Sequence, residues 1–169
     1  CALPHGTTQT ALKAALEEKP ELRVVDLSAD FRLSDPDAYA RWYGHEHRAT
    51  ALQEEAVYGL TELYRAQVAK ARLVGNPGCY TTTGILALAP LLSAGLIDPD
   101  AVVIDAKSGV TGAGRAAKEA MLFAEVAEGM HAYGVGAHRH TAEFDQELSR
   151  AAGRPVEATF TPHLIPMNR

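Results

Sequence analysis

The chain has 169 residues, of which 47% are hydrophobic and 22% are charged. This composition is that of a folded protein rather than a disordered segment, and the length corresponds to one ordinary domain or two small lobes. The net charge of -5 disfavours a nucleic-acid partner, because proteins that bind phosphate backbones present basic surfaces. The longest apolar run, from Ile85 to Leu92, contains Pro90 and is too short for the ~20 residues of a membrane-spanning helix. We therefore expect no membrane partner.

The two ends of the chain and its cysteines add further expectations. The sequence begins at Cys1 without a basic segment, so no signal peptide is recognised, and it stops at Arg169 inside a strand-like stretch. We therefore expect a piece of a longer protein. Cys1 and Cys79 form neither a CxxC motif nor a disulfide framework. A reducing, cytoplasmic location is the expectation.

Apolar periodicity and helix-ending residues predict alternating helices and strands, which is typical of an α/β protein with a parallel sheet. The predicted helices cover residues 9–18, 35–42, 80–93, 116–128 and 141–152. The predicted strands cover residues 22–27, 73–75, 101–107 and 156–165. The polar stretch 44–53 is predicted to be a surface loop. Thr7 or Thr8 is expected to cap the first helix with its side chain.

Cys79 is the first candidate for chemistry. It lies between the turn Asn76-Pro77-Gly78 and the first turn of a predicted helix. Unsatisfied backbone N–H groups and the positive end of the helix dipole point at such a position, and both favour the thiolate form of a cysteine. The alternative from the residues alone is a small, buried, unreactive cysteine.

The second candidate is the glycine-rich segment 108–115, which follows a predicted strand. Backbone amides in such a loop approach an anion closely, and Ser108, Thr111 and Arg115 add polar donors. No Lys-Ser/Thr pair follows its last glycine, so it is not a P-loop, and its GxxGxG spacing differs from the dinucleotide GxGxxG. The alternative is a flexible turn without a ligand.

The third candidate is a pair of histidines, His138 and His140. A histidine near a thiolate holds it as an ion pair or acts as a general acid and base. His45 and His47 form a second HxH pair, but a zinc site needs three or four convergent ligands, so no metal is expected. From the residues alone, an enzyme with Cys79 as nucleophile competes with a non-catalytic anion-binding domain and with a metal-binding module.

In this order, these features resemble the N-acetyl-γ-glutamyl-phosphate reductase family, an arginine-biosynthesis family related to aspartate-semialdehyde dehydrogenase. The cysteine and histidine elements together are specific, whereas the glycine loop alone is not. Carrier-protein-linked aminoadipyl-phosphate reductases share the HRHTAE element, but NPGCY and SGVTGAGR favour the arginine-pathway family. The matching segments are LPHG (3–6), VVDLSADFRL (24–33), YGLTELYR (58–65), GNPGCYTTTG (75–84), SGVTGAGR (108–115), AHRHTAEF (137–144) and FTPHLIPMNR (160–169).

The resemblance implies an α/β fold in which part of a Rossmann-like cofactor domain, residues 1–75, joins a partial α+β catalytic domain, residues 76–169. The family's glycine-rich turn for the cofactor pyrophosphate has no counterpart in this sequence. The implied activity is the NADPH-dependent reductive dephosphorylation of an acyl phosphate to an aldehyde through a cysteine thioester. A homodimer or homotetramer is implied for the full-length protein.

The resemblance also implies roles for individual residues. The catalytic residues are Cys79 and His138. The residues implied to contact the substrate are Arg115, His140, Arg32 and Asn76, and those implied to contact the cofactor are Ser28, Ser108, Gly109 and Gly112. Which of Arg32, Arg115 and Arg169 holds the substrate anion stays open.

Overall fold

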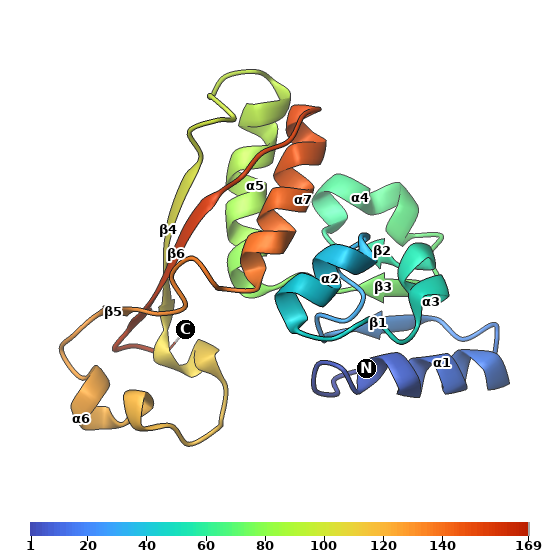
Figure 1. Cartoon of the computed structure of the whole chain (residues 1–169), viewed down its shortest axis with the longest axis horizontal. Helices are drawn as coiled ribbons and strands as arrows, with labels where there is room; N and C mark the ends of the chain where they lie inside the picture. The colour runs from blue at the N-terminus through green and yellow to red at the C-terminus, as the bar shows by residue number, and fades with distance from the viewer. Residues whose placement is uncertain (169) are drawn as a thin grey trace. The chain divides into compact units, whose positions relative to one another are not determined.

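The computed structural model describes residues 1–168, and the chain divides into two compact units, Cys1–Ala87 and Leu88–Arg169 (Figure 1). Each unit contains both helices and a sheet, so the predicted α/β class is confirmed. Helix α5 (Cys79–Ser93) begins in the first unit and ends in the second. Across the part of the chain that the structure describes, no helix has the length and apolar character needed to cross a membrane.

The first unit is built on a parallel sheet with the strand order β1-β3-β2 (Figure 1). Its strands are β1 (Val24–Asp26), β2 (Val57–Tyr58) and β3 (Leu73–Gly75). Its helices, besides the start of α5, are α1 (Thr8–Glu18), α2 (Pro36–Tyr43), α3 (Thr50–Glu55) and α4 (Thr61–Val68). All neighbouring strands run in the same direction, so their carboxyl ends meet at one edge of the sheet.

The core of this unit joins α1 to the sheet. Leu12 and Leu16 are four residues apart, which places both on one face of α1. They pack with Val24 of β1, Leu73 of β3 and the buried Phe31. The predicted helix 9–18 and the predicted strand 73–75 are therefore confirmed, and the predicted strand 22–27 is present in shorter form.

Two of the helix starts in this unit, those of α1 and α2, behave differently. Thr7 occupies the N-cap of α1, but its backbone is already helical (φ -85°, ψ -34°) and its side chain makes no capping bond, so the capping prediction is wrong. A capping side chain needs an extended backbone, which turns its oxygen toward the first turn. Asp35 has that backbone (φ -93°, ψ 115°) and accepts a hydrogen bond from the Asp37 N–H at 2.9 Å. The predicted start of α2 is thereby confirmed.

The stretch 44–53 is not the surface loop that its polarity predicts. It contains the start of α3, and two of its polar side chains are buried. The His47 ring Nε2 lies 2.7 Å from the Asp30 carbonyl oxygen, and the Gln53 amide donates to the Leu33 carbonyl oxygen at 2.8 Å. Polar side chains are buried at little cost when backbone groups satisfy them. The partners come from a distant segment, so the local pattern does not reveal them.

His47 is expected to make folding sensitive to acid. Its Nε2 donates to Asp30 and its Nδ1 accepts from the Ala49 N–H at 3.1 Å, an arrangement that requires the neutral ring. Burial lowers the pKa of His47 from its ordinary value of 6.5. Below that pH the His47 ring takes up a proton in the unfolded chain but stays neutral in the folded chain. The free energy of unfolding therefore falls as the pH falls. The loss is about 1.4 kcal/mol for one pH unit within this window.

This expectation is checked by urea denaturation of the parent protein and of the His47→Asn variant at pH 7.5 and 5.5. The variant lacks the titrating ring, so its stability should decrease less on acidification than that of the parent. The exposed His45 provides the control, because His45→Asn should keep the parental pH dependence. Equal acid sensitivity in His47→Asn and the parent would contradict the prediction.

The second unit contains a mixed sheet with the strand order β4-β6-β5 (Figure 1). Strand β4 (Val103–Gly109) runs parallel to β6 (Thr159–Ile165), and β5 (His131–Ala132) pairs with β6 in the antiparallel direction. The two long strands begin two and three residues later than predicted. Their start residues, Ala101 and Val156, lie outside the ladder.

Two helices of this unit pack against each other. The end of α5 lies beside α7 (His140–Ala152), and the Ser93 hydroxyl donates to the Ala151 carbonyl oxygen at 3.1 Å. Phe144 of α7 is fully buried, and its ring meets that of Phe160 of β6 with centroids 5.0 Å apart. The predicted helices 80–93 and 141–152 are therefore confirmed, each beginning one residue earlier.

The predicted helix 116–128 is wrong. The segment contains only a short 3-10 turn, η2 (Glu119–Met121), and the four-residue α6 (Phe123–Val126). Leu122 between them has an extended backbone (φ -64°, ψ 148°). Val126 is the one buried residue of α6, whereas Phe123 is 85% exposed. A short helix is stable when one face packs against the rest of the protein, and this segment offers too little apolar contact for that.

Candidate active site

Cys79 is the first residue of α5, and its side chain is exposed. It follows the turn Asn76-Pro77-Gly78, which leaves the carboxyl end of β3. The structure thus confirms the predicted position of this cysteine at a helix start. Ligands of open parallel sheets bind at the carboxyl edge of the strands. Cys79 therefore lies at the edge where a ligand is expected.

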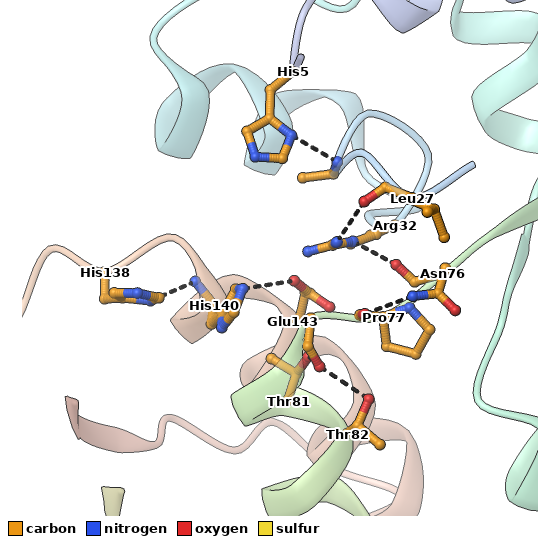
Figure 2. A network of polar contacts seen from close by, with 12 residues as sticks. His5, Leu27, Arg32, Asn76, Pro77, Thr81, Thr82, His138, His140 and Glu143 are labelled. Carbon is orange, nitrogen blue, oxygen red and sulfur yellow. Dashed lines mark hydrogen bonds and ion pairs between the residues drawn. The ribbon is translucent and has the colours of Figure 1, made fainter. Parts of the chain in front are cut away.

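Threonine side chains hold the first turn of α5. The Gly78 carbonyl oxygen accepts hydrogen bonds from the Thr81 and Thr82 hydroxyls, each at 2.9 Å, and from the Thr82 N–H at 2.9 Å (Figure 2). The Asn76 side-chain amide donates to the Pro77 carbonyl oxygen at 3.1 Å. Such local bonds from hydroxyls to carbonyls compete with ordinary helix geometry and shape the backbone near a helix start. They fix the backbone directly around Cys79.

Several polar side chains are buried at the end of β1 and in the loop that follows it. Asp26, Ser28, Asp30 and Arg32 are all buried, although each carries a charge or a hydroxyl. The Ser28 hydroxyl donates to the Asp26 carboxylate at 2.5 Å and accepts from the Asp30 N–H at 3.1 Å. Burial raises the pKa of Asp26. The Ser28 hydroxyl is thus engaged inside the loop, and its role in cofactor binding stays a prediction.

Arg32 and Asn76, two of the predicted substrate contacts, meet in the structure. The Arg32 Nε donates to the Asn76 carbonyl oxygen at 2.7 Å, and its Nη2 donates to the Leu27 carbonyl oxygen at 3.1 Å (Figure 2). These bonds connect the loop after β1 with the loop after β3. Arg32 is 8% exposed, so most of its guanidinium faces the protein.

The LPHG segment is tied to the same loop. The His5 Nδ1 accepts from the Ala29 N–H at 2.9 Å (Figure 2), and the Gly6 N–H donates to both oxygens of the Asp30 carboxylate at 2.8 and 2.9 Å. The Tyr39 hydroxyl also donates to Asp30, at 2.8 Å. Sequence reasoning missed His5 and Asp30. The only signal was that both fall within matched motifs, and their spacing does not reveal the contact.

His138 belongs to the second unit and is half-buried. Its Nδ1 accepts from the His140 backbone N–H at 3.2 Å (Figure 2). The pKa of His138 lies below its ordinary value of 6.5. Burial is the larger cause, and the adjacent Arg139 cation is the smaller one. The neutral ring with an accepting Nδ1 carries its proton on Nε2, which makes that nitrogen a donor.

Sequence reasoning missed a buried carboxylate beside this pair. Glu143 is fully buried one helical turn after His140, and its Oε1 lies 3.9 Å from the His140 Nε2 (Figure 2). Residues three apart on a helix are neighbours, so the H-x-x-E spacing within HRHTAE is a signal that could have found it. His138, His140 and Glu143 thus form one polar element at the start of α7.

The glycine-rich segment forms a tight turn. Ser108 and Gly109 end β4, and the turn itself is the 3-10 segment η1 (Val110–Ala113). A Cβ on Gly112 would lie 2.5 Å from the Ser108 Oγ, so a larger residue there would force the Ser108 side chain to move. Gly114 has φ +90° and ψ -171°, a conformation that side chains exclude. Three predicted cofactor contacts, Ser108, Gly109 and Gly112, are therefore brought together.

The three arginines predicted to compete for the substrate anion differ in their surroundings. Arg32 is buried between two loops, whereas Arg115 is exposed directly after the glycine-rich turn. Arg169 lies outside the described residues. An exposed guanidinium next to a backbone turn is well suited to an anionic ligand.

The second HxH pair serves the fold of the first unit. His47 uses both ring nitrogens on backbone groups, and the His45 Nδ1 lies 3.1 Å from the Glu46 carbonyl oxygen. Within residues 1–168, no three side chains among His, Cys, Asp and Glu come together as metal ligands do.

Comparisons with known proteins identify the two parts of the chain. A family model described as "Semialdehyde dehydrogenase, NAD binding domain" matches residues 1–71, and one described as "Semialdehyde dehydrogenase, dimerisation domain" matches residues 79–169. The expected fold class, a Rossmann-like cofactor domain joined to a domain of the semialdehyde dehydrogenase type, is therefore confirmed.

Individual relatives point the same way. The chain is 70% identical to the N-acetyl-gamma-glutamyl-phosphate reductase of Afipia carboxidovorans and 65% identical to that of Rhodospirillum rubrum. It is 59% identical to a rice protein named probable N-acetyl-gamma-glutamyl-phosphate reductase, chloroplastic. Each match covers 100% of this chain, and 48%, 49% and 40% of the respective relative. The chain thus spans about half the length of the curated bacterial relatives it matches. With one model on each part and similar proteins along its whole length, the chain belongs to the semialdehyde dehydrogenase family.

Proposed function

We propose that this chain is part of an N-acetyl-γ-glutamyl-phosphate reductase, which converts N-acetyl-γ-glutamyl phosphate to N-acetyl-glutamate 5-semialdehyde with NADPH. The observation that carries the proposal is the exposed Cys79 at the first residue of α5, beside the carboxyl end of β3. The names of the relatives support the same reaction. An inert cysteine in an anion-binding domain needs neither the exposure nor the helix start.

Cys79 acts as the nucleophile in this proposal. Cys79 is the first residue of α5, so backbone N–H groups of the first helical turn lie beside its side chain. The thiolate attacks the carbonyl carbon of the acyl phosphate, the C–O bond to phosphate breaks, and a thioester to Cys79 remains. The same N–H groups stabilise the oxyanion that forms during attack. Covalent catalysis divides one difficult substitution into two easier steps.

His138 acts as the proton donor. The Nε2–H of the neutral ring donates a hydrogen bond to the oxyanion that develops when the thioester carbonyl is reduced, and the oxyanion takes this proton as the ring is reprotonated from solvent. His140 and Asn76 are proposed to contact the substrate, and the exposed Arg115 to bind its phosphate. Collapse of the reduced adduct then releases the aldehyde and returns Cys79 to its thiol form.

The residues present fit a nicotinamide cofactor at two places. The carboxyl ends of strands β1, β3 and β2 lie at one edge of the parallel sheet. Dinucleotides bind at this edge in sheets of this kind. In the η1 turn, Thr111 and Gly112 are exposed and Gly112 carries no side chain, so backbone groups of this turn are open to a ligand. When bound, NADPH supplies the hydride for reduction of the thioester.

We also propose that residues 1–75 form the cofactor domain and residues 76–169 the catalytic domain. A homo-oligomer of the full-length protein belongs to the same proposal, supported by the description of the model that matches residues 79–169 as a dimerisation domain. The partners are thus a small acyl phosphate and further copies of the same protein, in the cytoplasm.

The proposal is tested by turnover of the full-length protein that contains this chain. Oxidation of NADPH, followed by its absorbance, should require N-acetyl-γ-glutamyl phosphate and should release one phosphate for each NADPH consumed. An aminoadipyl phosphate on a carrier protein is the control substrate and should not be reduced. Reduction of the carrier-linked substrate in place of the free one would favour the related carrier-dependent activity, and no reduction of either would reject the reductase.

A further inference from the structure

The guanidinium of Arg32 is one of the few charged groups buried in the first unit. Its Nε donates to the Asn76 carbonyl oxygen at 2.7 Å, and its Nη2 donates to the Leu27 carbonyl oxygen at 3.1 Å (Figure 2). A guanidinium presents its donors in a rigid planar fork, so two bonds fix its orientation as well as its position. One side chain therefore joins the loop after β1 to the turn before α5.

The two segments that Arg32 joins are in close backbone contact. A Cβ on Gly75 would lie 2.3 Å from the Phe31 carbonyl oxygen, a distance that side-chain carbons do not adopt. The next residue, Asn76, donates its N–H to the Asp26 carbonyl oxygen at 2.8 Å. The chain that leads into the turn thus lies directly against the loop that carries Arg32.

Arg32 binds the carbonyl oxygen of Asn76, the residue directly before Pro77. Pro77 has no N–H, so it contributes no donor to the turn. Gly78 on the far side is held by the hydroxyls of Thr81 and Thr82. Only Pro77 and Gly78 lie between Asn76 and Cys79, so the direction of this carbonyl determines how the chain enters α5.

We propose that Arg32 is a positioning residue: by holding the Asn76 carbonyl, it sets the orientation of the turn that presents Cys79. Arg32 thus acts through the backbone and does not contact the substrate anion. Its effect on turnover rests on the reductase function proposed above. Its effect on the Cys79 thiol does not depend on that function and is measured separately.

The two roles of Arg32 predict different kinetics. A positioning residue affects the reacting geometry, and a misplacement of about 1 Å can lower the rate about 100-fold. We therefore expect Arg32→Gln to lower kcat about 10- to 100-fold, with KM changed less than about 2-fold. Loss of a substrate contact would instead raise KM.

The thiol itself provides the direct test. Iodoacetamide alkylation of the Cys79 peptide is followed by mass spectrometry across a pH series in the full-length protein, with the peptide of the exposed Cys1 as internal reference. Arg32→Gln should change the rate and pH profile at Cys79 relative to Cys1. Arg32→Lys, which keeps the positive charge but has a single donating nitrogen in place of the planar fork, should restore part of the parental profile.

Arg72→Gln is the matched control. Arg72 lies in the same unit before β3 and binds Glu55 through two hydrogen bonds and the Pro20 carbonyl oxygen through a third. Its loss should leave kcat and the Cys79 profile unchanged. An unchanged Cys79 profile in both Arg32 variants, or a raised KM with normal kcat, would overturn the proposal. If the parent protein lacks reductase activity, the alkylation result still decides whether Arg32 controls Cys79.

Discussion

Replacement of Cys79 by alanine is expected to lower kcat of the full-length protein by a factor on the order of 10,000 to 1,000,000, as loss of a catalytic nucleophile does in other enzymes. The variant has no group that forms the thioester, and an alanine methyl group offers no alternative nucleophile. The side chain of Cys79 is exposed, so its removal should leave folding intact. A loss of turnover without a loss of stability would therefore report on chemistry.

The covalent step is measured directly. Acid quenching of the parent protein during turnover, followed by mass spectrometry, should reveal an acyl adduct on the peptide that contains Cys79. The adduct should be missing in Cys79→Ala. Cys1→Ser is the matched control, because Cys1 is also an exposed cysteine of the first unit, and this variant should retain adduct and turnover. Near-normal turnover of Cys79→Ala would reject the thioester mechanism.

Replacement of His138 by asparagine is expected to lower kcat about 100- to 10,000-fold, the usual contribution of a general acid or base. Asparagine donates a hydrogen bond but does not release a proton, so it stabilises the oxyanion poorly. The substrate should still bind, and the acyl adduct on Cys79 should persist because the later proton transfer is slow. Disappearance of the adduct in this variant would instead assign His138 to the first step.

The pH dependence gives a second measure of His138. Burial and then the Arg139 cation lower its pKa, so the ring stays neutral when the pH falls below 6.5. The limb of the rate profile that reports on His138 should therefore lie below pH 6.5 and vanish in His138→Asn. Arg139→Gln removes one of the two causes and should move this limb to higher pH. A limb that stays in place in both variants would exclude His138 as its origin.

Local patterns predicted the elements whose causes are local. Leu12 and Leu16 share a helix face because of their spacing, and α1 lies where that spacing places it. The Pro77-Gly78 pair ends one segment and begins another, and α5 starts directly after it at Cys79. In each case the deciding interactions lie within about one helical turn, so the sequence displays them.

The wrong predictions concern segments whose state depends on distant contacts. The polarity of the segment around His47 predicts a surface loop, but the Asp30 carbonyl oxygen accepts a hydrogen bond from the buried His47 ring. Segment 116–128 has a helical pattern, yet it forms only the 3-10 turn η2 and the four-residue α6, and its apolar Leu122 and Phe123 are exposed. A sequence pattern shows which residues are apolar, but it does not show which residues they contact in the folded protein.

The amino-acid sequence by itself determined the family, the α/β class and the place of Cys79 at a helix start. The order of the motifs and the residues that form turns are local features, so they can be recognised without the fold. Only the tertiary structure decided that Arg32 holds the Asn76 carbonyl and that Asp30 holds the LPHG segment. It also placed the buried Glu143 beside His140. The bonds of Arg32 join the loops after β1 and β3, and those of Asp30 join the loop after β1 to the segment before α1. The partners are backbone groups common to every residue. Their geometry exists only once the strands have paired.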